Sequence, residues 1–89
     1  MSLFTRSTDI TAAIACYRFL NDGLARDLRE RTGRSPAELA RELSADVDAA
    51  TLERWERGES LPVGHRATAY GHALQALEAE VQRTTPARR

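Results

Sequence analysis

Few side chains in this 89-residue sequence have the chemistry to catalyse a reaction or to hold a metal. Cys16 is its one cysteine, and His65 and His72 are its two histidines. The histidines are seven residues apart and can share a helix face, but no cysteine or carboxylate stands beside them at ligand spacing. Cys16 lies in an apolar stretch, where a thiol is typically buried and unreactive. We therefore expect no catalytic residues, no enzyme activity, no cofactor and no metal.

Charge of one sign is concentrated in residues 44–60, SADVDAATLERWERGES, where five acids face two arginines and give a formal charge of −3. The whole chain is neutral, with 13 basic and 13 acidic residues, and every basic residue is an arginine. Such arginine usage is typical of a GC-rich bacterial or phage genome. Neutrality argues against a strongly basic nucleic-acid coat, but it allows a small basic face balanced by an acidic one.

The length allows one domain, in which a lone core is marginal and burial against a partner would add stability. One cysteine cannot form an internal disulfide, and no apolar run is long enough to span a membrane. The N-terminus, MSLFTRSTDI, lacks the layout of a signal peptide. We expect a cytoplasmic protein with no membrane association and no small-molecule ligand.

The elements that position these residues are predicted to be helices throughout, because no stretch alternates with the period of a strand. A first helix is predicted over 9–21, with Ser7 or Thr8 as its N-cap. Its apolar face comprises Ile10, Ile14, Tyr17 and Leu20. Asn21-Asp22-Gly23 favours a break after this helix, although one long helix across the glycine is the alternative.

Capping signals delimit the remaining helices, which are predicted over 23–32, 36–44, 49–57 and 65–83. Gly33 and Gly58 are placed to end the helices that precede them. Ser35 and Glu38 have the spacing of a capping box, and Asp48 can cap the helix that follows it. The apolar face of the last helix comprises Ala67, Tyr70, Leu74, Leu77 and Val81. We divide the chain into a helical extension (1–22), a domain (23–83) and a flexible tail (84–89).

Two short helices joined by a tight connection, with helices on both sides, have the order of a helix-turn-helix DNA-binding domain. The span from Leu24 to about Leu77, about 60% of the chain, resembles the Cro/repressor-type helix-turn-helix family of bacterial and phage regulators. The matching phrases are Leu28-Arg29-Glu30-Arg31-Thr32-Gly33, Ser35-Pro36-Ala37-Glu38-Leu39-Ala40-Arg41-Glu42-Leu43, Leu52-Glu53-Arg54-Trp55-Glu56-Arg57-Gly58 and Pro62. The resemblance implies an all-α, compact five-helix, lambda-repressor-like domain with an extra N-terminal helix and an extended C-terminal helix.

The resemblance also implies roles for individual residues. Arg29 and Glu56 should form a buried or half-buried ion pair that fixes the geometry, Ala40 should lie where the two motif helices cross, and Trp55 should be core. Helix 49–57 should read the major groove. Its implied base-reading residues are Ala49, Ala50, Glu53 and Arg54, of which Arg54 suits guanine and Glu53 suits cytosine. The alternative for Arg54 is a solvated arginine or a partner of Asp46 or Glu59.

Phosphate contacts are expected from helix N-termini and from basic flanking residues. The candidates are the backbone of Ser35, Pro36 and Ala37, and the side chains of Arg34, Arg41, Thr51, Arg57, His65 and Arg66. An ordinary solvated charge is the alternative for each of them.

The sequence departs from the family pattern in four ways. Eight residues separate Leu43 from Leu52 where the family usually has six, so either the turn bulges or a helix is extended. Pro36 replaces a glutamine that clamps a phosphate, and Arg34 replaces an apolar residue. The recognition segment is acidic, which lowers affinity for a phosphate backbone.

The best single interpretation is a sequence-specific regulator, such as a repressor, that binds double-stranded DNA, with a homodimer on two half-sites compensating for modest affinity. The dimer surface would lie on the N-terminal or C-terminal helix, unless these two helices cover each other within one chain. The alternative function is a protein-interaction module, antirepressor-like or antitoxin-like, whose acidic face (44–60) binds a basic partner.

Overall fold

Each helix of the chain begins and ends at residues with short-range capping chemistry. The computed structural model describes the backbone of residues 2–84 and the side chains of residues 10–83. Within this range the chain is all-helical, with five helices and no strand. The helices are α1 (Ser2–Asn21), α2 (Leu24–Arg31), α3 (Pro36–Leu43), α4 (Ala49–Arg57) and α5 (His65–Thr84).

The predicted helix signals between residues 21 and 58 are confirmed. Gly23, between α1 and α2, has φ +74°, a left-handed conformation that glycine adopts without strain. The helix is therefore interrupted there, as favoured from the sequence. Ser35 and Glu38 form the capping box at the start of α3. The Asp48 carboxylate accepts a hydrogen bond from the backbone N–H of Thr51 and caps α4.

The predicted start of the first helix was wrong, whereas the last helix agrees with its prediction to within one residue. Helix α1 begins at Ser2 rather than at residue 9, so Ser7 and Thr8 lie inside the helix instead of capping it. No glycine or proline interrupts residues 2–21, and serine and threonine disfavour a helix interior only slightly. Helix α5 ends at Thr84, and the rest of the predicted tail (85–89) lies outside the described residues.

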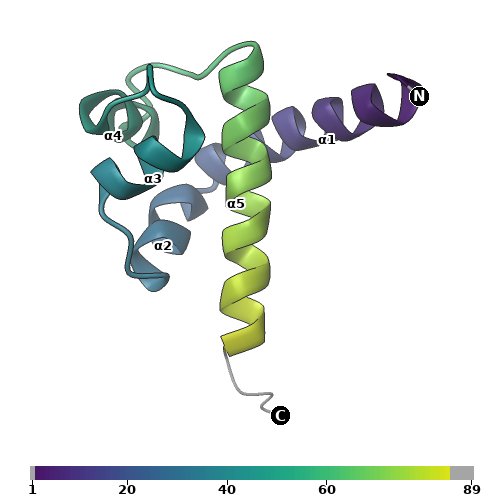
Figure 1. Cartoon of the computed structure of the whole chain (residues 1–89). Helices are drawn as coiled ribbons and strands as arrows, with labels where there is room; N and C mark the ends of the chain where they lie inside the picture. Colours follow the sequence, from purple (N-terminus) through teal and green to yellow (C-terminus); the bar gives the residue numbers. More distant parts are fainter. Residues whose placement is uncertain (1, 85–89) are drawn as a thin grey trace.

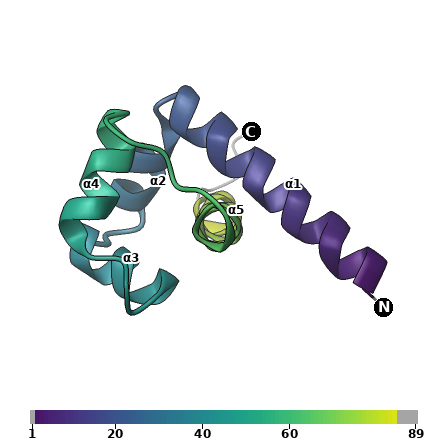
Figure 2. The same ribbon diagram turned by 90° about the horizontal axis from the view of Figure 1, so that it is seen from above.

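Helix α5 occupies the centre of the molecule, with α1 on one side of it and α2, α3 and α4 on the other (Figures 1 and 2). One core joins all five helices and the turn between α3 and α4. Its buried residues are Cys16, Ala25, Leu28, Leu39, Ala40, Val47, Leu52, Trp55, Tyr70, Leu74 and Leu77. Trp55 and Ala40 therefore take the buried positions that were expected of them, and burial of these side chains drives folding.

Helices α1 and α5 cross at very short range through small residues. A Cβ added to Gly71 would lie 1.8 Å from the backbone oxygen of Ala12, so only glycine permits this approach. Ala12 and Cys16 are fully buried in the contact, whereas Ile10 and Ile14 are more than half exposed. The two helices do pack together, but of the four residues expected on the apolar face of α1, Leu20 alone packs against the core.

No helix in the described range combines the length and the apolar character needed to cross a membrane.

Candidate nucleic-acid interface

The connection between α3 and α4 is a turn anchored in the core. Helix α3 ends at Leu43, and Ser44 follows in an extended conformation. Val47 is 5% exposed and inserts into the core cluster. The longer spacing is therefore accommodated by a bulged, non-helical turn over 44–48 rather than by a longer helix. Sequence reasoning missed the role of Val47, although an apolar residue between two aspartates, Asp46 and Asp48, was a signal for it.

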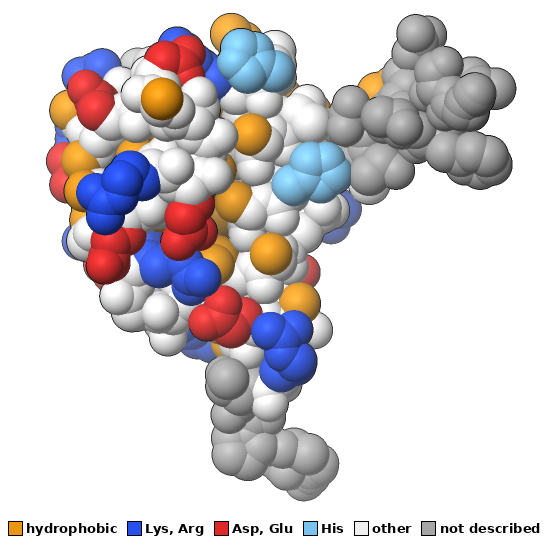
Figure 3. Space-filling view, viewed as in Figure 1, with side chains coloured by type: hydrophobic (Ala, Val, Ile, Leu, Met, Phe, Trp, Pro, Cys, Tyr) orange, Lys and Arg blue, Asp and Glu red, His pale blue; other side chains and the backbone are white. Residues whose placement is uncertain are grey.

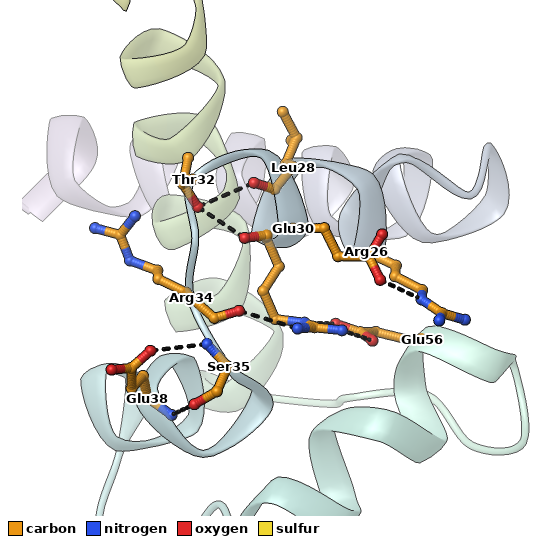
Figure 4. A network of polar contacts seen from close by, with 9 residues as sticks. Arg26, Leu28, Glu30, Thr32, Arg34, Ser35, Glu38 and Glu56 are labelled. Atoms are coloured by element: carbon orange, nitrogen blue, oxygen red, sulfur yellow. Dashed lines mark hydrogen bonds and ion pairs between the residues drawn. The ribbon is translucent and has the colours of Figure 1, made fainter.

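A buried ion pair holds α4 against α2, as predicted (Figure 4). Arg29 donates to both Glu56 oxygens, from Nε at 2.7 Å and from Nη2 at 3.0 Å, in a bidentate geometry. A third donor, Nη1, reaches the carbonyl oxygen of Arg34 at 3.0 Å. The side chains are 8% and 4% exposed. The hydrogen bonds that Arg29 donates to Glu56 raise the pKa of Arg29 above its ordinary value, so the guanidinium stays charged and orients α2, the loop before α3, and α4 together.

A tyrosine hydroxyl lies buried close to this pair. The Tyr70 ring packs against Trp55, with ring centroids 5.3 Å apart. Within the described residues, its hydroxyl is buried and has no hydrogen-bond partner. Burial raises the pKa of Tyr70, and the charge of Glu56 raises it further. The hydroxyl therefore stays neutral, and Tyr70 serves the core rather than a reactive site.

The four candidate base-reading residues lie together on the first two turns of α4. Ala49 and Glu53 are one turn apart, as are Ala50 and Arg54, so the four share one side of the helix. Ala50 and Arg54 are exposed, and the other two are half-exposed. Arg54 Nη2 lies 3.5 Å from the hydroxyl oxygen of Thr51 on the same helix. Within the described part of the chain no ion pair restrains Arg54, so its guanidinium can reach outward.

Three of the candidate phosphate-binding arginines are instead paired with acids of the same chain. Arg34 contacts Glu42 at 3.1 Å and Glu80 at 3.3 Å. Arg57 forms an ion pair with Glu59 at 2.7 Å, and Arg66 forms one with Asp46 at 2.7 Å. Asp46 and Glu59, the acids considered as partners of Arg54, form their ion pairs with Arg66 and Arg57, although the charge of Arg54 also helps to lower the pKa of Glu59.

Asp46 links the turn between α3 and α4 to the start of α5. Its carboxylate accepts hydrogen bonds from Arg66 and from the hydroxyl of Ser44. The Arg66 contact, followed by the Ser44 contact, lowers the pKa of Asp46 to about 2. Sequence reasoning did not find this pair, since its two members are 20 residues apart.

These pairs offset most of the acidity of residues 44–60. Arg29 and Arg66, from outside the segment, bind Glu56 and Asp46 and reduce its formal charge from −3 to −1. Acidic and basic side chains alternate over the α2 and α3 side of the molecule, without a continuous basic area on the visible face (Figure 3). The candidate interface is therefore close to neutral.

Carboxylates also occupy the N-termini of α3 and α4. The Glu38 carboxylate accepts from the backbone N–H of Ser35 at 2.8 Å, and that hydrogen bond lowers the pKa of Glu38. Pro36 has no N–H, which leaves the N–H of Ala37 as the donor that the capping box does not use. A phosphate at the start of α3 would meet one backbone donor and a nearby negative charge.

The two remaining charged candidates for phosphate contact are exposed: Arg41 lies on α3, and His65 is the first residue of α5.

Within the described residues, no three His, Cys, Asp or Glu side chains are grouped so that they could hold a metal ion. Burial raises the pKa of the Cys16 thiol to about 12, so this cysteine stays protonated at neutral pH.

No protein-family model, no curated protein and no solved structure matches this chain.

Proposed function

We propose that this chain is a binding protein rather than an enzyme, and that it regulates transcription by binding double-stranded DNA in the cytoplasm of a bacterium, as a host or phage repressor of the Cro type. In this proposal α3 and α4 are the two helices of a helix-turn-helix motif, and α4 enters the major groove. The observation that carries the proposal is the grouping of Ala49, Ala50, Glu53 and Arg54 on one solvent-facing side of α4.

The rigid mounting of α4 supports this function. A helix that reads base edges must keep a fixed orientation toward its supporting helices, since each side chain reaches only one or two bases. The bidentate contact from Arg29 to Glu56 and the burial of Leu52 and Trp55 provide this fixation from the side of α4 opposite Ala50 and Arg54.

The paired arginines indicate modest affinity for each copy of the chain. A phosphate that recruits Arg34, Arg57 or Arg66 must first displace a carboxylate from it. Each such exchange reduces the gain from counterion release. Binding of two copies to two half-sites would restore affinity, and exposed Arg41 and Arg54 would make the first contacts.

Replacement of Arg54 tests the reading role of α4. Because Arg54 is exposed and makes no core contact, we expect Arg54→Ala to fold normally by circular dichroism. It should lose about 1–3 kcal/mol of preference for its operator over unrelated DNA, the cost of one bidentate base contact. Fluorescence anisotropy with labelled duplexes measures both affinities. The matched control is Arg83→Ala, an exposed arginine in the last turn of α5. Unchanged preference in Arg54→Ala would refute its reading role.

A second function is favoured by the carboxylates of Glu38 and Asp48, which lie at the two helix N-termini where a phosphate would bind. On this alternative the chain is a protein-interaction module, antirepressor-like or antitoxin-like, and the face formed by residues 44–60 contacts a basic protein. A stable complex with such a partner, together with no retention of DNA at low salt, would favour it over the first proposal.

A further inference from the structure

An apolar stripe on α1 faces solvent. Ile10 is 55% exposed, Ile14 is 54% exposed and Tyr17 is 37% exposed. Their spacing of four and three residues aligns them along one side of the helix. The opposite side of α1, with Ala12 and Cys16, is fully buried against the core. Helix α1 is thus apolar on two sides, of which this chain covers only one.

The stripe continues onto the loop that precedes α5. The hydroxyl of Tyr17 donates to the carbonyl oxygen of Pro62 at 2.7 Å, which holds this loop against α1. The residues on either side of Pro62 are strongly exposed: Leu61 at 60% and Val63 at 68%. Tyr17 and Leu61 also line a groove of about 470 Å³ whose floor includes Trp55. We call Ile10, Ile14, Tyr17, Leu61 and Val63 the α1 surface.

The other candidate dimer surface, the apolar face of α5, is already buried in the core of its own chain. Tyr70, Leu74 and Leu77, the main apolar residues of α5, are at most 2% exposed and belong to the core of their own chain. Val81, also on this face, is half-exposed but packs against the same core, so the larger apolar side chains of α5 are already in contact with their own chain.

Helices α1 and α4 lie on opposite sides of α5 (Figure 2), and the groove reaches α4 only at its C-terminal end, at Trp55 and Gly58. A partner on α1 therefore leaves the exposed side of α4, with Ala50 and Arg54, uncovered.

We infer that the α1 surface binds the α1 surface of a second copy of this chain, in a twofold dimer. A twofold contact sets a surface against itself, so any charge in it would meet a like charge. The α1 surface consists of isoleucine, tyrosine, leucine and valine, and is free of that repulsion. The chain also has a net charge of zero, so two copies approach without overall electrostatic repulsion.

The size of the surface sets the strength of the dimer. The five side chains alone are smaller than the roughly 800 Å² per partner of a standard interface. Helix α1 has 20 residues and is therefore about 30 Å long, which lets two such helices lie along each other and add contact area. An interface of less than standard size is typical of weak association, so we expect a dissociation constant of about 1 µM or above. Its formation is independent of DNA, and only its use on two half-sites depends on the proposed function.

Sedimentation equilibrium of the full chain tests the inference over about 1 µM to 1 mM, the range of moderate to weak affinities. We expect the wild-type mass to rise to that of a dimer within this range. Ile14→Glu should raise the dissociation constant at least about tenfold, because the twofold buries two introduced carboxylates. Its side chain is exposed, so circular dichroism should be unchanged. Ala76→Glu, which adds the same charge at an exposed position of α5 outside the α1 surface, is the matched control and should dimerise normally.

Ile14→Ala provides a second variant that removes apolar area without adding charge, and it should weaken the dimer less than Ile14→Glu. A wild-type chain that stays monomeric at 1 mM, or a dimer that Ile14→Glu and Ile14→Ala leave unchanged, would overturn the inference. If Ile14→Glu dissociates the dimer and the wild-type dimer retains no DNA, the inference is upheld and the proposed function is contradicted.

Discussion

At the scale of single residues, the structure depends on acids and arginines that meet across long stretches of sequence. Arg29 reaches Glu56 over 27 residues, and Arg66 reaches Asp46 over 20. The two pairs differ in burial, since the first is almost fully enclosed and the second is exposed. An enclosed pair is costly to break because one charge is left without a partner, whereas an exposed pair is solvated when it opens.

Replacement of Glu56 should therefore destabilise the chain strongly. Glu56→Ala leaves the Arg29 guanidinium buried and unpaired, and we expect a loss of about 3–5 kcal/mol in the free energy of unfolding. Urea unfolding followed by circular dichroism measures the loss. Glu53→Ala, on the same helix but half-exposed, is the control and should change stability by less than about 0.5 kcal/mol. Equal effects of the two substitutions would contradict a structural role for the buried pair.

The pair of Asp46 and Arg66 should make stability depend on pH in acid. The pKa of Asp46 falls from its ordinary 3.8 to about 2 in the folded chain. Its stabilising contribution is therefore complete above pH 4 and is lost as the pH falls toward 2. We expect Asp46→Asn to have a lower midpoint of thermal unfolding than the wild type at pH 6, and the gap to close as the pH approaches 2. A gap that stays constant over this range would show that the carboxylate charge of Asp46 does not stabilise the fold.

At the scale of elements, the close crossing of α1 and α5 decides which side of α1 is buried. Gly71 allows the backbone of α5 to approach that of α1, and Ala12 and Cys16 fill the contact. Larger residues such as Ile10 and Ile14 do not fit at this separation and remain outside. The exposed stripe of α1 thus reflects the close contact of Gly71 with the side of α1 that carries Ala12 and Cys16.

Gly71→Ala tests this close crossing, because the sign of the change in the free energy of unfolding differs between the two possible outcomes. Helix propensity alone predicts that alanine stabilises α5 by about 1 kcal/mol. The added Cβ would meet the backbone of Ala12 at 1.8 Å, so the helices must separate, and we expect a net loss of about 1–3 kcal/mol in the free energy of unfolding. Chemical denaturation measures it, and stabilisation by the substitution would refute the close approach.

The helix boundaries between residues 21 and 58 could be predicted from the sequence because caps are short-range features. Ser35 with Glu38, Asp48 with Thr51, and Gly23 each act within three or four residues. The buried side of α1 could not be predicted in this way, because it depends on Gly71, some sixty residues along the chain. The pairing of Asp46 with Arg66 could not be predicted either, because the two residues are 20 apart in the sequence. The grouping of the four candidate base-reading residues on α4 followed from helix geometry, while their contact with DNA stays a prediction.

At the scale of the whole molecule, the chain balances 13 arginines against 13 acids and spends most of the charges near α3 and α4 on internal pairs. Such a surface attracts DNA weakly from a distance, so the proposed regulator relies on contacts made by α4 and on a second copy. The dimer inferred through α1 would supply the second copy while leaving the side of α4 that carries Ala50 and Arg54 exposed in both copies.

The most direct test of the proposed function is selective retention of DNA by the purified wild-type chain. The chain would be titrated against a pool of upstream fragments from its own genome at about 50 mM and 200 mM salt, a range over which phosphate contacts weaken markedly. We expect one or a few fragments to be retained at the lower salt concentration and to be released as salt rises. No retention at the lower concentration would contradict DNA binding and turn the search to a basic protein partner.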